Sequence, residues 1–119
     1  MVTFTSFRHA YKGLRAVVGR ERNARIHLFF AVLAVLASWL FQISIFQLSL
    51  VIFAIILVFF AEITNTAIER TLDLIVTERN QVVQLIKDMT AGGVLVCALG
   101  ALAIAVCVFG PRVYQMLAK

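Results

Sequence analysis

The sequence has 119 residues, of which 62% are hydrophobic and only 14% are charged, with a formal net charge of +5. A water-soluble domain of this size cannot bury so much apolar surface. The composition therefore excludes that class and predicts one all-α integral membrane domain over residues 1–119. The basic residues flank apolar segments, as expected for contact with anionic lipid headgroups, and this distribution argues against a nucleic-acid partner.

Residues 1–25 predict an amphipathic helix followed by a polar hinge. Apolar side chains recur at helical spacing while the basic ones lie off that stripe, which is typical of a helix lying in the membrane interface. A soluble-type helix packed on the rest of the protein is the alternative. Thr3 or Thr5 is available as an N-cap, and the hinge covers Gly19 to Asn23. The apolar stripe consists of Phe4, Phe7, Tyr11, Leu14 and Val18.

Three apolar segments follow, each near the roughly 20 residues that a helix needs to cross a bilayer. We expect transmembrane helices over about residues 28–46, 48–75 and 91–110, the last of them ended by Pro111. The third segment is rich in Gly and Ala, which allow transmembrane backbones to approach closely and therefore suit subunit or helix packing.

The distribution of charge predicts how the chain is oriented. Nine of the eleven Lys and Arg residues are expected on one side of the membrane, and only Arg112 and Lys119 on the other. The positive-inside rule then places the N-terminus and the loop after the second span in the cytoplasm. All six acidic residues are expected on that same side.

A polar stripe ends the second predicted span. At about 100° per residue its members fall on one narrow face of the helix. A carboxylate in lipid costs roughly 2.5–3.5 kcal/mol, so several on one stripe indicate that they hold a cation or move a proton. A structural network that locks helices together is the alternative. The stripe consists of Glu62, Asn65, Thr66, Glu69 and Asp73.

Other polar groups are expected at the same membrane boundary: Glu21 precedes the first span, and Lys87-Asp88 precedes the third. Carboxylate and amide oxygens suit Mg²⁺, which often shares phosphate oxygens, and a lysine suits a phosphate as a point charge. These are the parts needed for phosphoryl transfer. The sequence has neither a P-loop motif nor the protein-kinase motifs, so a nucleotide site must be built in another way.

The same residues resemble the prokaryotic diacylglycerol kinase family, which includes undecaprenol kinases. The run from Glu62 to Glu69, followed by Asp73, is similar to one signature of that family. Lys87-Asp88-Met89 with Ala91-Gly92-Gly93 resembles a second signature, and Tyr11 to Arg15 and Glu21 to Arg25 resemble its N-terminal part. The similarity covers nearly the whole chain.

This resemblance implies a homotrimeric enzyme of the bacterial inner membrane that uses ATP and Mg²⁺, with active sites formed between neighbouring subunits. By matched position, Glu62 would be the general base for the lipid hydroxyl and Asn65 would orient the site. Glu21 and Glu69 would hold Mg²⁺ with the nucleotide phosphates. The remaining nucleotide contacts would come from Lys87, Asp88 and the loop Glu78-Arg79-Asn80.

The lipid substrate stays open between diacylglycerol and undecaprenol. The sequence Arg25-Ile26-His27 is similar to short members of Gram-positive type, many of which prefer undecaprenol. The diacylglycerol-specific proteobacterial branch has an acidic residue in place of this histidine. We interpret His27 as a helix-end residue near the headgroups.

Two functions of other classes remain as alternatives. A small ion-coupled transporter would use the carboxylates of Glu62 and Glu69, although such groups usually lie near the bilayer midplane with few other charges. A non-enzymatic adaptor would use the basic N-terminal segment to bind anionic lipid, but that function leaves Asn65 and Glu69 without a role.

Overall fold

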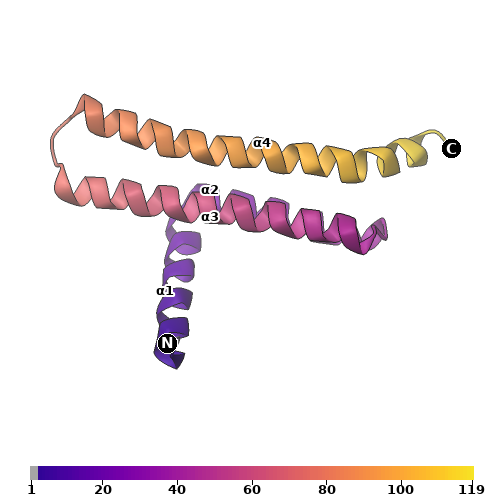
Figure 1. Ribbon diagram of the computed structural model, residues 1–119, viewed down its shortest axis with the longest axis horizontal. Coiled ribbons are helices and arrows are strands. Elements are labelled where there is room, and N and C mark those ends of the chain that lie inside the picture. The colour runs from indigo at the N-terminus through magenta and orange to yellow at the C-terminus, as the bar shows by residue number, and fades with distance from the viewer. Residues whose placement is uncertain (1–2) are drawn as a thin grey trace.

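The computed structural model describes residues 3–119, which form four α-helices joined by short connections. They are α1 (Phe4–Arg20), α2 (Arg22–Leu40), α3 (Ile45–Ile75) and α4 (Gln81–Leu117). Helices α2, α3 and α4 run alongside one another, whereas α1 leaves them crosswise (Figure 1). The predicted all-helical architecture is confirmed.

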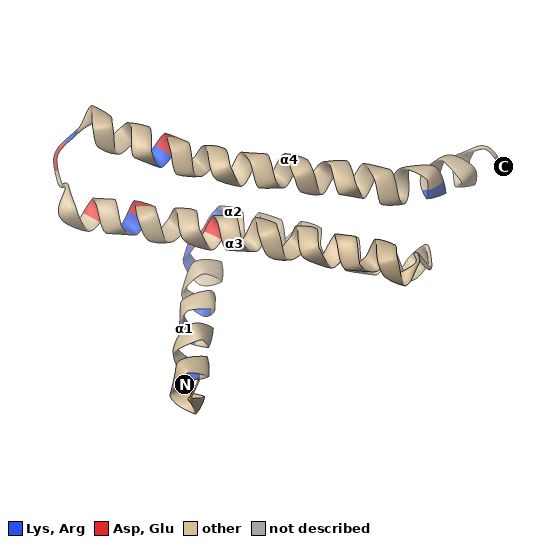
Figure 2. Ribbon diagram, viewed as in Figure 1, with Lys and Arg blue, Asp and Glu red and all other residues tan. Residues whose placement is uncertain are grey.

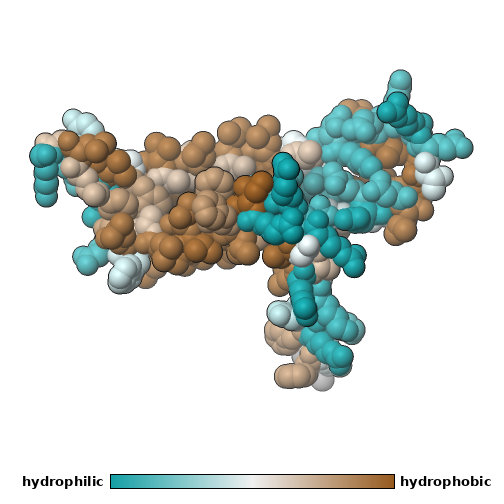
Figure 3. Space-filling model, turned by 180° about the vertical axis from the view of Figure 1, so that it is seen from behind, coloured by the Kyte–Doolittle hydropathy of each residue, from teal (hydrophilic) through white to brown (hydrophobic). Residues whose placement is uncertain are grey.

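Three of the helices are long and apolar enough to cross a membrane, as predicted. Their side chains leave a small core, formed by Ala24, Val51, Ala54, Val58 and Val108, while many large apolar side chains are exposed. Most of the surface of these helices is therefore hydrophobic, as the brown band in Figure 3 shows. In a membrane protein this surface faces lipid or other protein rather than water.

A single residue separates α1 from α2. Glu21 adopts an extended conformation, with φ −102° and ψ 118°, and its backbone N–H still closes α1 by donating to the carbonyl of Val17. The polar hinge is therefore shorter than the predicted segment from Gly19 to Asn23, and helix resumes at Arg22. Thr3 is the N-cap of α1, but its side chain makes no capping hydrogen bond.

The connection between α2 and α3 ends earlier than predicted because of a capping box. The backbone N–H of Gln47 donates to Ser44 Oγ at 3.1 Å, and the backbone N–H of Ser44 donates to Gln47 Oε1 at 3.1 Å. This reciprocal pair satisfies two N–H groups that the first turn would leave free. Helix α3 therefore begins at Ile45, whereas we expected helix from residue 48.

Helix α4 is longer than the predicted third span at both ends. It begins at Gln81, where Asn80 Oδ1 accepts hydrogen bonds from the backbone N–H groups of Val82 and Val83. The prediction that Pro111 ends the helix is wrong, because the helix continues to Leu117. A proline removes one backbone donor and distorts the turn before it, which kinks a helix as readily as it ends one.

The segment around Pro111 is held to the far end of α2. Arg112 Nη1 donates to the carbonyl of Phe41 at 3.2 Å. The rings of Phe41 and Phe109 lie 6.2 Å apart between centroids. These contacts offset part of the roughly 3 kcal/mol that a proline costs inside a helix. Within the described chain, a Cβ atom added at Gly92, Gly93 or Gly100 would meet no atom within 4 Å, so these glycines do not serve helix packing inside one chain.

Candidate functional site

The polar stripe of α3 is the most buried polar feature of the molecule. Glu62, Asn65 and Thr66 are only 2%, 8% and 9% exposed. They lie one to two turns beyond Val58, a core residue of the same helix. At helical spacing the stripe is therefore a continuation of the buried face of α3. The stripe is thus covered by protein on the side where the sequence places its polar groups.

Among the fully buried side-chain nitrogen and oxygen atoms of residues 3–119, Asn65 Oδ1 is the one that has no hydrogen-bond partner. A buried amide oxygen left unpaired costs about 1–3 kcal/mol, and most such atoms in proteins are paired. Its neighbours on the stripe are Glu62 and Glu69. A donor or a cation brought by a ligand would satisfy this oxygen.

His27 faces Glu62 across the contact between α2 and α3. The atoms His27 Nε2 and Glu62 Oε2 lie 3.7 Å apart, and the two side chains are 20% and 3% exposed. The interpretation of His27 as a helix-end residue near the headgroups did not include this contact. The available signal was its position at the start of the first apolar segment, which is the membrane depth at which Glu62 ends the apolar part of the second.

Glu21 is held against the same end of α3 by an ion pair. Arg70 Nη2 donates to Glu21 Oε1 at 2.7 Å, and the Arg70 side chain is 59% exposed. Glu69 lies one turn before Asp73 and two turns beyond Glu62 on the same face of α3. We call Glu21, His27, Glu62, Asn65, Glu69 and Arg70 the junction cluster, because they gather where α1, α2 and α3 meet.

A second group of polar residues lies further along the hairpin that α3 and α4 form. Lys87 Nζ donates to Asp73 Oδ1 across the two helices, and Gln84 Nε2 donates to Asp88 Oδ1 at 2.9 Å. We call Asp73, Gln84, Lys87 and Asp88 the hairpin cluster. Asp73 follows Glu62 by about 16 Å along the axis of α3 at 1.5 Å per residue, so the cluster is separate from the buried base.

The predicted nucleotide-contacting loop lies at the tip of this hairpin. Glu78 and Arg79 are exposed, and Asn80 uses its side chain to cap α4. On the face that Figure 2 shows, charged residues lie on α1 and, in α3 and α4, on the part of these helices between the crossing of α1 and the tip of the hairpin. The opposite end carries Arg112 and Lys119.

Residues 3–119 bring no three His, Cys, Asp or Glu side chains close enough together to hold a metal ion by themselves. Of the two predicted Mg²⁺ ligands, Glu69 lies two helical turns beyond Glu62 on α3, about 10 Å along the helix axis, and Glu21 is paired with Arg70. Mg²⁺ is commonly bound by one or two carboxylates together with substrate phosphates. The acidic residues present therefore fit such a cation only when phosphate oxygens complete its shell.

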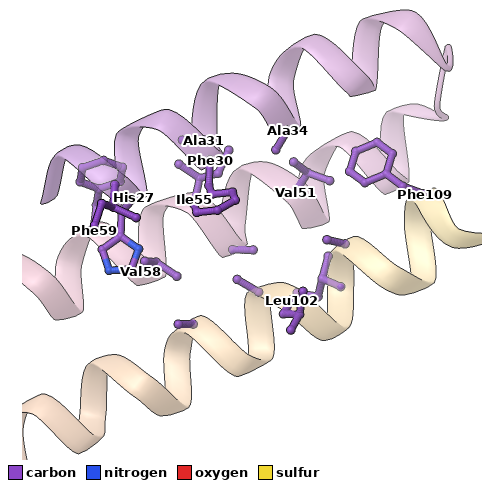
Figure 4. A pocket seen from close by; sticks show the side chains of 16 residues that line it. His27, Phe30, Ala31, Ala34, Val51, Ile55, Val58, Phe59, Leu102 and Phe109 are labelled. Carbon is purple, nitrogen blue, oxygen red and sulfur yellow. The ribbon is translucent and has the colours of Figure 1, made fainter. Parts of the chain in front are cut away.

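A cavity of about 350 Å³ lies between α2, α3 and α4. The side chains of sixteen residues line it, and all of them are apolar except His27 (Figure 4). His27 stands at one end of the cavity and Phe109 at the other, with Val58 and Phe59 on α3 beside the histidine (Figure 4). The junction cluster and this cavity are therefore joined through one side chain.

The chain is similar to known proteins over most of its length. Residues 8–109 match the model of the family described as prokaryotic diacylglycerol kinase. The chain is 33% identical over 109 residues to an undecaprenol kinase of Bacillus subtilis, covering 92% of this chain and 89% of that protein. It is 30% identical over 113 residues to a diacylglycerol kinase of Synechocystis sp., covering 94% of this chain and 65% of that longer protein.

Proposed function

Because this chain belongs to the prokaryotic diacylglycerol kinase family, whose two matched relatives are named as lipid kinases, we propose that it transfers the γ-phosphoryl group of ATP to the hydroxyl of a membrane lipid alcohol, with Mg²⁺ as cofactor. The proposed site lies at the cytoplasmic face of the bacterial inner membrane. There the hydroxyl of a lipid and a nucleotide from the cytosol can meet.

The observation that carries this proposal is the burial of Glu62 at the end of an apolar helix. Glu62 is 2% exposed and has Asn65 and Thr66 one turn further along α3. In the proposed reaction Glu62 accepts the proton of the lipid hydroxyl while the hydroxyl oxygen bonds to the γ-phosphorus. The bond from that phosphorus to the β–γ bridging oxygen breaks, and ADP leaves. Asn65 orients the reacting groups through its unpaired Oδ1 or its amide N–H groups.

Glu21 and Glu69 are the residues proposed to hold Mg²⁺, which neutralises charge on the phosphates when it is bound. Glu69 lies about 10 Å from Glu62 along the helix axis. A base and a metal ligand on one stripe can therefore serve opposite ends of the transferring phosphoryl group. Glu21 must exchange its pairing with Arg70 to take part. The Arg70 side chain is 59% exposed and that of Glu21 is 24% exposed, so water screens the pair in part and breaking it costs about 1 kcal/mol.

The hairpin cluster is proposed to bind the nucleotide. Lys87 would bind phosphate, and Asp88 with the loop residues Glu78, Arg79 and Asn80 would contact the rest of ATP. In the described chain Lys87 is instead paired with Asp73. A phosphate group bound at this position would replace the Asp73 carboxylate as the partner of Lys87, because phosphate and carboxylate are both anionic oxygen acceptors for a lysine.

We propose further that the enzyme is a homotrimer whose active sites lie between subunits. Two features support this. The hairpin cluster is separate from Glu62 in one chain, and α4 leaves Gly92, Gly93 and Gly100 facing open space, which suits contact with another helix. The crosswise direction of α1 (Figure 1) supports the proposal that this helix lies in the cytoplasmic membrane interface while α2, α3 and α4 cross the bilayer.

The test is an assay in mixed micelles that contain the full chain, labelled ATP, Mg²⁺ and either undecaprenol or diacylglycerol. We expect label in the lipid phase that depends on Mg²⁺. Folded protein that labels neither lipid would overturn the proposal. Proton- or sodium-driven uptake by that same preparation would favour the ion-coupled transporter instead.

A further inference from the structure

Arg70 is the one Lys or Arg residue of the junction cluster, and the proposed reaction gives it no role beyond its contact with Glu21. Its Nη2 atom donates to Glu21 Oε1 at 2.7 Å, and its side chain is 59% exposed. This is the only side-chain hydrogen bond that Arg70 makes within residues 3–119. A guanidinium carries its N–H donors in a planar fork that fits carboxylate or phosphate oxygens, so most of the donors of Arg70 remain available to a ligand.

The packing of α2 on α3 places this ion pair at the depth of the proposed metal ligands. Helix α2 leaves the junction and α3 returns to it, and His27 of α2 faces Glu62 of α3. Glu21 precedes His27 by six residues, about 9 Å along a helix axis. It therefore lies about level with Ile68 and Glu69 of α3, which follow Glu62 by a similar distance. The two carboxylates proposed to hold Mg²⁺ are thus at one depth.

The side chain of Arg70 lies between the proposed base and a proposed metal ligand. Long side chains on a helix extend toward its N-terminus and cover the preceding turn. Arg70 follows Thr66 by four residues on α3, so its guanidinium extends over the turn at Thr66. That turn separates Glu62 from Glu69. In the proposed reaction the γ-phosphoryl group lies between the base and the metal, so Arg70 is next to the oxygens of that group.

The charges of the junction cluster call for a cation beside the phosphates. The cluster contains three carboxylates, those of Glu21, Glu62 and Glu69, and one guanidinium. A nucleotide bound to Mg²⁺ is still an anion, and the carboxylates repel it at close range. A positive side chain beside the phosphates reduces this repulsion and stabilises the charge on the transferring group. Within the junction cluster of one chain, Arg70 is the side chain that can supply this charge.

We propose that Arg70 exchanges partners when the site is occupied: it leaves Glu21, which turns to Mg²⁺, and binds oxygens of the γ-phosphate of ATP. This inference rests on the proposed function and adds a phosphate-binding residue to that site. Every charge keeps a partner during the exchange, because Glu21 gains the metal as Arg70 gains the phosphate. The exchange is favourable because a partly exposed ion pair is weak, whereas a guanidinium can bind phosphate oxygens in a bidentate manner.

The experiment measures binding without turnover. The full chain in micelles is titrated calorimetrically with β,γ-methylene-ATP, which cannot transfer its γ-phosphoryl group, and separately with ADP, both with Mg²⁺. Arg70→Gln should weaken the binding of β,γ-methylene-ATP by about ten- to a hundredfold, because hydrogen bonds to a charged group are lost, and should change ADP binding by less than about twofold. A loss for ADP as large as that for β,γ-methylene-ATP would mean that Arg70 acts only through Glu21 and would overturn the inference, as would unchanged binding of both. A wild-type chain that binds neither nucleotide would instead overturn the proposed function.

Two further variants separate phosphate binding from the general effect of removing a charge. Arg22→Gln removes the same charge one residue from Glu21, but Arg22 is exposed and makes no ion pair within residues 3–119. We expect it to leave both affinities within about twofold of the wild type. Arg70→Lys retains a positive charge that binds phosphate as a point charge, and it should recover part of the lost affinity for β,γ-methylene-ATP. Losses of equal size in Arg22→Gln and Arg70→Gln, or a folded Arg70→Lys variant that binds no better than Arg70→Gln, would contradict the assignment of Arg70.

Discussion

The junction cluster and the hairpin cluster contain similar side chains in opposite surroundings. Glu62 in the junction cluster is almost fully buried and faces His27 on another helix. Asp73 in the hairpin cluster is 58% exposed and pairs with Lys87. One chain therefore already encloses the proposed base, while the hairpin cluster is partly open to solvent, with Lys87 27% and Asp73 58% exposed. The two halves of the proposed reaction consequently respond differently to mutation.

The largest expected effect is that of Glu62→Gln, which removes the proton acceptor and keeps the side-chain volume. General base catalysis contributes typically 10²- to 10⁴-fold, so we expect kcat to fall by about that factor with little change in the KM for ATP. The control is Thr64→Val, because Thr64 is an exposed neighbour whose hydroxyl donates to the carbonyl of Phe60. Steady-state kinetics in micelles measure both, and full activity of the glutamine variant would remove Glu62 from the role.

Glu69→Ala should weaken the binding of Mg²⁺ and leave the proposed proton acceptor, Glu62, in place. We expect activity to be lost at millimolar Mg²⁺ and to return in part at much higher concentrations, because one of the two proposed carboxylate ligands is gone. A titration of activity against Mg²⁺ measures this shift. An unchanged Mg²⁺ dependence would mean that Glu69 is not a ligand.

A smaller effect is expected in the exposed hairpin cluster. Lys87→Gln removes a phosphate-binding charge, and we expect the KM for ATP to rise by about tenfold or more while the KM for the lipid stays the same. The thermal stability of the variant should change little, because an exposed ion pair such as Lys87–Asp73 contributes about 0–1 kcal/mol. A stability loss without an effect on ATP would give the pair a structural role only.

The smallest effect on activity is expected at the opposite end of α4. Pro111→Ala restores a backbone donor within the helix and should raise the unfolding temperature, since proline costs roughly 3 kcal/mol in a helix interior. Activity should stay within about twofold of the wild type, because Pro111 is remote from both clusters. Thermal unfolding monitored by circular dichroism, together with the kinase assay, measures both quantities.

Much of the fold follows from local rules that act within one segment. Helical periodicity places Glu62, Asn65 and Thr66 on one face, and the structure buries that face. The beginning of α3 was also readable in Ser44-Ile45-Phe46-Gln47, a pattern in which serine and a glutamine three residues later cap each other. The error at Pro111 has a different cause: the consequence of a proline depends on the contacts of the segment after it, here those of Arg112 and Phe41.

The parts of the candidate site that the sequence did not reveal depend on packing between helices. No other polar side chain at helical spacing along the apolar part of α2 marks His27 as a site residue. Its contact with Glu62 forms only when α2 packs on α3. The pairing of Glu21 with Arg70 spans 49 residues of the chain, so no local pattern indicates it. The cavity likewise depends on the spacing of three helices, which small residues permit but do not fix.

The most direct test of the central proposal, that the two clusters are halves of one active site contributed by different chains, combines two impaired variants in one oligomer. Glu62→Gln and Lys87→Gln are co-expressed with different affinity tags, isolated as mixed oligomers through both tags in turn, and assayed at an ATP concentration well below the KM, at which Lys87→Gln alone keeps about a tenth of the wild-type rate or less and Glu62→Gln alone keeps less still. We predict that the mixed oligomers regain lipid phosphorylation, because some sites then combine an intact base from one chain with an intact lysine from its neighbour. Mixed oligomers that are folded and remain inactive would contradict the claim.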